Sequence, residues 1–140
     1  MLLALDLVRI IGINLYMDKV TTPQAVIYID ESQIIYVKTF DIAYIDIDEA
    51  TDTLTIAKHF VLNEPKLILV DLRQCKKITA KAKSLFKKSN CAEKYKAKAI
   101  VINSKLICKI KNIFIPIDHR SPVKFFTSEL EAKWWLCSFN

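Results

Sequence analysis

Residues 66–88 read KLILVDLRQCKKITAKAKSLFKK, and this stretch decides the fold. It opens with an apolar run, residues 66–72, as expected for a strand that is buried on both faces of a parallel sheet. After a short polar turn, a helical pattern begins near Thr79. Its inward positions would be Ile78, Ala82, Leu85 and Phe86. A buried strand that leads into an amphipathic helix indicates an α/β fold.

The same alternation extends toward the N-terminus. Two runs rich in β-branched and aromatic residues, AVIYID (25–30) and IIYVK (34–38), are joined by the polar ESQ and predict a hairpin. After a loop at residues 40–44, Asp46 and Glu49 have the spacing of a capping box, which predicts the start of a helix. The inward positions of that helix would be Ile47, Ala50, Leu54, Ala57 and Val61.

The alternation also extends toward the C-terminus. AKAIVIN (97–103) predicts another buried strand, and a helix is expected over residues 104–114. VKFF (123–126) predicts a short strand, after which Thr127 or Ser128 would cap a last helix. The inward positions of these two helices would be Leu106, Ile110, Ile113 and Phe114 in the first, and Ala132, Trp135, Leu136 and Phe139 in the second.

The predicted element order is therefore β-β-α-β-α-β-α-β-α. Strands that alternate with helices require right-handed crossovers, which give a mainly parallel sheet with helices on its faces. The first hairpin adds an antiparallel N-terminal edge strand, and about four helices are expected. A chain of 140 residues has the size of one domain.

The N-terminal segment is expected to lie outside that domain, with residues 1–22 forming an extension and residues 23–140 forming the fold. Its apolar run has no basic residues before it, and Asp6 and Arg9 interrupt it, so it does not match a signal peptide. It is also too short and too charged to span a bilayer, and we do not expect an integral membrane protein. Met17 is an alternative start, which would place residues 1–16 upstream of the native chain.

The four cysteines are widely spaced and form no CxxC pair. A zinc site needs close pairs of ligands, so no metal is implied. A domain of this size does not need disulfide bonds for stability, and the cysteines indicate reduced, mostly buried thiols in a cytoplasmic protein. The chain has a single glycine, Gly12, and therefore no phosphate-binding loop and no implied cofactor.

Charge is distributed unevenly along the chain. Residues 1–75 carry 6 basic and 11 acidic side chains, whereas residues 76–111 carry 12 lysines against Glu93 alone. A lysine-rich segment can bind phosphates, acidic proteins or anionic lipid, or it can simply be a solvated face. Proteins that read nucleic acid rely on arginine and stacking aromatic side chains, and this segment has no arginine. The sequence therefore argues against a nucleic-acid partner.

The element order, together with VDLRQCKKIT, NSKLICKIKNIFI and VKFFTSELEAKWWL, resembles the SpoIIAA-like fold of STAS domains and of the lipid-binding CRAL-TRIO domains. The chain is most similar to small stand-alone STAS-like proteins of the Bacteroidota. Their third segment resembles S-x-L-x-R-x-I-x-N-x-F and their ending resembles F-T-D-E-E-E-A-L-E-W-L. The resemblance runs from about residue 25 to residue 139, and before residue 66 it is only architectural.

The resemblance implies a non-enzymatic protein that binds a partner, as anti-anti-sigma factors do. In those relatives a kinase phosphorylates a serine in a D-S-S-G-like turn between a strand and a helix. The matching residues here, 79–82, read TAKA and lack the acid, the serines and the glycine. The phosphoserine is therefore not carried over, and only Thr79 or Ser84 could accept a phosphate nearby.

Two alternatives remain open for Thr79. It would cap the helix, or, as a phosphothreonine, it would lie at a helix N-terminus among Lys76, Lys77 and Lys81. The ends of the predicted parallel strands also place Asp71, Asn103 and Thr127 near one edge of the sheet, where ligands and partners bind in open α/β folds. The simpler alternative is that polar residues there only cap helices.

Trp134 lies outside the predicted inward face of the last helix, four residues from Leu130. It would anchor an interface or complete the packing against neighbouring segments. Nucleophilic catalysis would need Cys75 or Ser121 beside a histidine and an acid. The run DHRS (118–121) holds such residue types, but adjacent loop residues rarely converge on one atom, and we expect no enzyme.

These patterns predict a regulatory or adaptor module that binds a protein partner not identified by the sequence. The candidate partner surface comprises Asp71, Lys76, Lys77, Thr79, Lys81, Asn103, Thr127 and Trp134. The alternative is a carrier of a lipid or another apolar ligand, which requires a sizeable apolar cavity. A third alternative is a lysine-rich surface that binds acidic partners without specificity.

Overall fold

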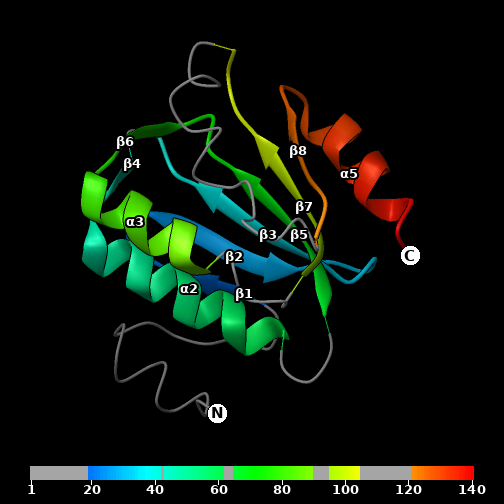
Figure 1. Cartoon of the computed structure of the whole chain (residues 1–140), viewed down its shortest axis with the longest axis horizontal. Helices are drawn as coiled ribbons and strands as arrows, with labels where there is room; N and C mark the ends of the chain where they lie inside the picture. Colours follow the sequence, from blue (N-terminus) through cyan, green and yellow to red (C-terminus); the bar gives the residue numbers. More distant parts are fainter. Residues whose placement is uncertain (1–18, 42, 62–64, 90–94, 105–120) are drawn as a thin grey trace.

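The computed structural model describes residues 19–41, 43–61, 65–89, 95–104 and 121–140 (Figure 1). These residues form a six-stranded sheet in the order β1-β2-β3-β5-β7-β8 and a separate two-stranded sheet, β4-β6. The strands of the large sheet are β1 (Lys19–Thr21), β2 (Ala25–Ile29), β3 (Ile34–Thr39), β5 (Lys66–Asp71), β7 (Tyr95–Val101) and β8 (Val123–Phe126). The helices are α2 (Ile47–Val61), α3 (Ala80–Ser89) and α5 (Glu129–Cys137).

The sheet has the predicted mixed character. Strands β3, β5, β7 and β8 are parallel, whereas β1, β2 and β3 pair in antiparallel fashion. Helices α2 and α3 cover one face of the sheet, and α5 covers the other (Figure 1). The described residues contain three helices, and the helix expected over residues 104–114 lies outside the described part of the chain apart from its first residue.

Two segments expected as irregular connections form a short parallel pair instead. β4 (Ala43–Ile45) lies in the predicted loop at residues 40–44, and β6 (Cys75–Ile78) lies in the predicted polar turn. In β4, Ala43 and Ile45 are buried and Tyr44 is exposed. This period of two is the mark of a strand, but a run of three residues is too short for the sequence pattern to reveal it.

Residues 19–21, which lie before the expected boundary at residue 23, form a strand of the large sheet. Lys19–Thr21 pairs with β2 as the edge strand of the large sheet. Val20 is 0% exposed and packs with the core residues between the sheet and α2. An apolar side chain at the centre of an edge strand contributes to the core, so residues 19–22 belong to the fold.

Helix α2 starts with one half of the predicted capping box, in which Glu49 Oε2 accepts a hydrogen bond from the backbone N–H of Asp46 at 3.1 Å. Its buried face differs from the prediction at one end. Ile47 is 36% exposed because it lies in the first turn, whereas Ile56 and Phe60 are buried beside Ala50, Ala57 and Val61.

The sheet packs differently on its two sides. On the α5 side, β7 presents the small residues Ala97 and Ala99, which allow Ala132 and Leu136 of α5 to approach closely. Ser128 is the N-cap of α5, as one of the two predicted candidates, and Trp135 packs against Phe126 and Phe139 as expected for an inward residue.

Two further observations concern the described residues. The helices found there are too short and too polar to cross a bilayer. Cys75 and Cys137 are free thiols and are half-buried rather than buried, and the other two cysteines, Cys91 and Cys108, lie outside the described residues.

Candidate functional site

The corner between β5 and α3 is built by the pairing of β6 with β4. Tyr44 lies opposite Lys77, and Ile45 lies opposite Ile78. Immediately after β6, the backbone N–H of Thr79 donates to the carbonyl oxygen of Ile45 at 3.0 Å. The first turn of α3 is thereby fixed beside the first turn of α2, and residues 43–46 lie beside residues 75–79.

Thr79 caps α3 and also connects the two helices. Its hydroxyl accepts a hydrogen bond from the backbone N–H of Ala82 at 3.3 Å, as an N-cap does. The same hydroxyl donates to Asp46 Oδ1 at 2.7 Å. A phosphate on Thr79 would meet the negative charge of this carboxylate, so the local electrostatics disfavour phosphorylation at this position.

Asp46 stands between two helix N-termini. Its Oδ1 accepts from Thr79 and from the backbone N–H of Ile47, the latter at 2.8 Å. The hydrogen bond from Thr79 is the main cause that lowers the pKa of Asp46, and the bond from Ile47 and the charges of Lys81 and Lys77 act in the same direction. An ionised carboxylate at this place favours both helix starts.

Three exposed apolar side chains lie on this corner. Tyr44 is 46% exposed, and Phe40, four residues before it, and Ile47, three residues after it, are also exposed. Lys77 places its Nζ atom 5.7 Å from the centre of the Tyr44 ring, which is a cation–π distance. With the exposed lysines of β6 and α3 they form what we call the corner surface: Phe40, Tyr44, Ile47, Lys76, Lys77 and Lys81.

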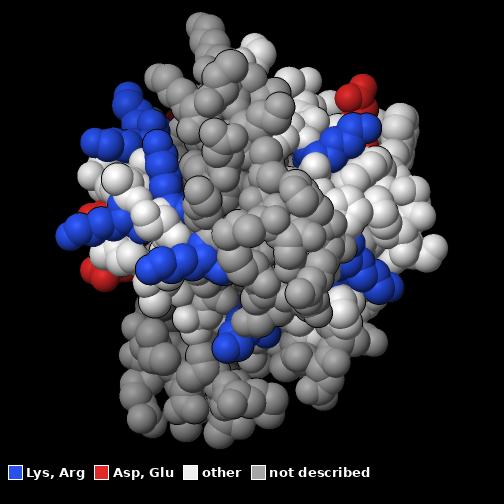
Figure 2. Space-filling view, in the orientation of Figure 1, with Lys and Arg blue, Asp and Glu red and all other residues white. Residues whose placement is uncertain are grey.

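The charge around the corner surface is mixed. Figure 2 shows lysine and arginine side chains gathered on the side where Figure 1 places α2 and α3, with acidic side chains beside them. Asp41 and Asp48 are exposed within the stretch that carries Phe40, Tyr44 and Ile47. The rim therefore offers both signs of charge rather than a uniform basic patch.

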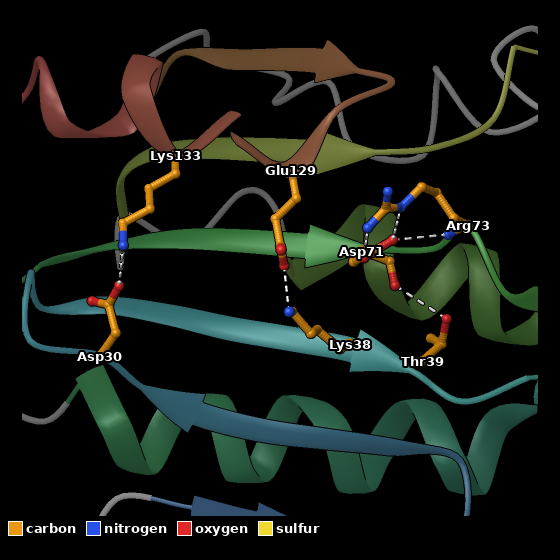
Figure 3. Close-up of polar contacts among 7 residues, drawn as sticks. All are labelled: Asp30, Lys38, Thr39, Asp71, Arg73, Glu129 and Lys133. Carbon is orange, nitrogen blue, oxygen red and sulfur yellow. Dashed lines mark hydrogen bonds and ion pairs between the residues drawn. The ribbon is translucent and has the colours of Figure 1, made fainter. Parts of the chain in front are cut away.

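Asp71 is held in an internal contact. It is buried at the end of β5, and its two carboxylate oxygens accept from Arg73 Nε at 3.0 Å and from an Arg73 terminal nitrogen at 2.7 Å (Figure 3). Its backbone carbonyl accepts from Thr39 Oγ1 at 3.1 Å. A bidentate pair with Arg73 stabilises the turn after β5 and leaves Asp71 little freedom to bind a partner.

Charged contacts also tie α5 to the sheet. Glu129 forms an ion pair with Lys38 on β3 (Figure 3). The Nζ atom of Lys133 lies 3.6 Å from Oδ2 of Asp30, in the turn between β2 and β3 (Figure 3). These contacts and the Asp71–Arg73 pair occupy the α5 side of the sheet, away from the corner surface. They explain how the last helix is oriented rather than where a partner binds.

The remaining predicted residues lie in two other places. Asn103 and Thr127 are exposed just beyond the ends of β7 and β8, on the edge of the sheet where β5 ends with Asp71. Trp134 is 65% exposed on α5, and Leu130 is exposed beside it, as the helical spacing predicted. The structure thus groups Lys76, Lys77, Thr79 and Lys81 at the corner and separates Trp134 from them.

The sequence pattern did not reveal Phe40, Tyr44 and Ile47 as surface residues. A signal for Tyr44 was present, because it alternates with two apolar residues that are small or β-branched in a strand-like run. Ile47 fitted the apolar stripe of α2 and was therefore placed inward. The buried stripe begins only after Ile47, and this follows from the position of the helix start relative to the sheet.

Cys75 and Ser121, which the sequence offered as candidate nucleophiles, both contact backbone carbonyl oxygens. The thiol of Cys75 contacts the carbonyl oxygens of Ala43 and Lys77 at 3.6 and 3.7 Å, and burial raises its pKa, which keeps it protonated. Ser121 donates to the carbonyl oxygen of Tyr95 at 2.6 Å. Within the described ranges there is no group of three His, Cys, Asp or Glu side chains that could hold a metal ion.

A pocket of about 270 Å³ lies between the sheet and helices α2 and α3. Its walls are mainly apolar and comprise Ala25, Val37, Thr39, Ile45, Thr51, Thr53, Leu54, Thr55, Ala57, Lys58, Ile68, Val70, Leu72, Ile78, Leu85, Phe86, Tyr95 and Lys98. Burial lowers the pKa of Lys98 to about 8 and raises the pKa of Tyr95 to about 12. The carrier alternative required an apolar cavity, but no sequence pattern indicated where it would lie.

The comparisons with known proteins place the chain by family and by fold. A family model described as a domain of unknown function, DUF7793, matches residues 27–140. A solved structure of an uncharacterized protein of the DUF3478 family from Shewanella loihica PV-4, which has a SpoIIAA-like fold, is similar with a TM-score of 0.60. The two chains are 19% identical, and the match covers 90% of this chain and 100% of that chain. The predicted SpoIIAA-like fold is confirmed. The search of curated proteins gives no match.

Proposed function

The chain belongs to the family of domains described as DUF7793, a domain of unknown function, and from this premise we propose that it is a non-enzymatic binding module. It acts as a regulatory or adaptor protein through protein–protein interaction, and its partner docks on the corner surface. The observation that carries the proposal is the exposure of Phe40, Tyr44 and Ile47 together on one fixed corner of the fold.

The form of this surface supports a protein partner. Aromatic side chains surrounded by a polar rim are the usual anchors of protein interfaces. The frame beneath them is pre-organised, since the β4–β6 pairing and the Thr79–Asp46 hydrogen bond fix both helix starts. A fixed frame lowers the entropy cost of binding. The mixed charge of the rim also argues against a non-specific basic surface, which was the third alternative.

The absence of catalytic activity is part of the same proposal. The polar groups proposed from the sequence are engaged in structural hydrogen bonds, as Thr79 is with Asp46 at the corner and Asp71 is with Arg73 on the α5 side of the sheet. The free thiols of Cys75 and Cys137 fit a reducing compartment, and we expect the protein to act in the cytoplasm.

The proposal can be tested by crosslinking in source cells with a lysine-reactive reagent, since the corner surface carries Lys76, Lys77 and Lys81. Wild type is compared with a Phe40→Ser/Tyr44→Ser variant and with Trp134→Ser as the matched control on α5. We expect one protein to crosslink to the corner lysines, to do so also in a lysate brought to high salt before the reagent is added, and to be lost only in the corner variant. A partner released by salt, or one lost only in Trp134→Ser, would contradict the proposal.

A second candidate function, carriage of a small apolar ligand, is favoured by the pocket between the sheet and the helices. Its volume of about 270 Å³ lies just below the roughly 300–1,000 Å³ typical of pockets for drug-sized molecules. Such a pocket suits one small molecule and not a two-chain lipid. Mass spectrometry of organic extracts from the natively purified protein would identify a ligand that co-purifies.

A further inference from the structure

The pocket extends along β5 and also across the neighbouring strands β2, β3 and β7, which all contribute to its wall. Ile68, Val70 and Leu72, at alternate positions of β5 and the residue that follows it, all contribute to its wall. A β-strand rises about 3.3 Å per residue, so these three residues mark a length of roughly 13 Å. A pocket with a volume of about 270 Å³ holds one small molecule, and the distance along β5 is long enough for a short alkyl chain.

The two ends of the pocket differ in chemistry. Lys98 on β7 lies opposite Ile68 in the sheet register, and Ile68 is the lining residue of β5 nearest to the start of that strand. Lys58, which is also in the lining, belongs to the last turn of α2, and this helix runs back toward the same end. The opposite end is lined by Ile45, Leu72 and Ile78, without a charged side chain among these residues.

A lysine is an unusual residue at the position of Lys98, which lies on an inner strand and faces the side of the sheet that α2 and α3 cover. It is 8% exposed, and its Nζ atom lies 5.1 Å from the centre of the Tyr95 ring. A lysine ammonium is strongly hydrated and is rarely buried in an apolar wall. An anion next to a buried ammonium is bound more strongly than it would be in water, because the local dielectric is low.

We propose that this pocket binds a small single-chain carboxylate, with the carboxylate at Lys98 and the alkyl chain extended along β5 toward Leu72 and Ile78. The inference rests on the second candidate function and adds the chemical class of the ligand and its orientation. It is independent of the corner surface, where the partner protein is proposed to dock.

The experiment is a calorimetric titration of the full chain with octanoate and with octanol, which share an alkyl chain and differ in charge. We expect octanoate to bind at least about tenfold more tightly than octanol, since a charge-assisted hydrogen bond is worth about that factor or more. In Lys98→Met the preference for octanoate is expected to disappear while octanol binding is kept. Methionine preserves the length and the apolar stem of lysine, so this variant removes mainly the charge.

Three control variants make the outcomes distinct. Lys58→Met tests whether the carboxylate lies instead at the exposed lysine of α2, and loss of the preference in this variant alone would overturn the proposed orientation. Lys96→Met removes an exposed lysine of the same strand and should change nothing. Thr51→Trp places a bulky ring at an exposed position of the lining and should weaken both ligands.

The failures of the two ideas can be told apart. Equal binding of octanoate and octanol in the wild type, both weakened by Thr51→Trp, would leave an apolar ligand pocket and overturn the carboxylate assignment. Binding of neither molecule, in a protein whose circular dichroism spectrum and unfolding transition are those of a folded chain, would overturn both the assignment and the second candidate function.

Discussion

At the scale of single residues, Thr79 has the clearest structural role in the corner. Its hydroxyl is used in both directions, as an acceptor from Ala82 and as a donor to Asp46. The sequence indicated the cap but not the bond to Asp46, because that contact joins residues 33 positions apart through the pairing of β4 with β6. A local pattern can reveal a cap; it cannot reveal which side chain the fold brings next to it.

Replacement of Thr79 by valine removes the cap and leaves Asp46 without its donor. We expect Thr79→Val to lower the free energy of unfolding by about 1–2 kcal/mol, the usual cost of losing an N-cap. Thr79→Ser, which keeps the hydroxyl, should lie close to wild type. Thr79→Glu should be less stable than Thr79→Ser, because it sets a second negative charge beside Asp46. Urea unfolding of the four proteins measures these differences, and a stable Thr79→Glu variant would be inconsistent with the repulsion.

The burial of Lys98 predicts that the stability of the protein depends on pH. Its pKa in the folded protein is about 8, whereas a lysine in the unfolded chain titrates near 10.4. Between these values the native state binds fewer protons than the unfolded state, so the contribution of Lys98 to stability rises with pH. Below pH 8 the group is charged in both states, and its burial remains a constant cost.

We therefore expect the free energy of unfolding to rise by about 2 kcal/mol between pH 8 and pH 10, measured by urea unfolding. Above about pH 10 the raised pKa of Tyr95 acts in the opposite direction, which closes the window. Lys98→Met should remove the rise, whereas the exposed Lys96→Met should keep it. An unchanged rise in Lys98→Met would show that another group causes it.

At the scale of elements, α5 illustrates what periodicity can predict. The pattern assigned Trp135 to the inward face and Trp134 to the flank, and the structure agrees, with Trp135 against Phe126 and Phe139 and Trp134 65% exposed. The same reasoning was wrong for Ile47 of α2. Periodicity describes a helix of indefinite length, whereas burial also depends on where the sheet beneath the helix ends.

The two tryptophans give a paired test of this element. Trp135→Ala should cost about 2–3 kcal/mol, since it removes ring packing from a half-buried site. Trp134→Ala should stay within about 0.5 kcal/mol of wild type, as exposed substitutions usually do. Thermal or chemical unfolding measures both. A large loss in Trp134→Ala would mean that this side chain packs against a part of the protein and is not exposed in solution.

At the scale of the whole molecule, the architecture was accessible from the sequence because each buried strand is followed by an amphipathic helix. β1, β4 and β6 were not, since each has at most two buried or half-buried apolar residues, whereas β8, which also holds only four residues, was predicted from VKFF. The corner surface and the pocket were not accessible from the sequence either. Each of them is assembled from segments that lie far apart in the sequence.

The edge strand β1 provides the last prediction, which concerns the extent of the domain. A chain that starts at Met17 keeps β1, whereas a chain that starts at residue 23 loses it together with Val20, which is 0% exposed. Burial of a valine side chain contributes about 2 kcal/mol, and the loss of β1 also leaves β2 as an unpaired edge. We expect the shorter chain to be less stable by about 2 kcal/mol or more and more prone to association, because an unprotected edge strand can pair with another chain. Urea unfolding and size-exclusion chromatography compare the two truncated chains directly. Equal stability would mean that β1 is dispensable and that the domain starts near residue 23, as the sequence pattern first indicated.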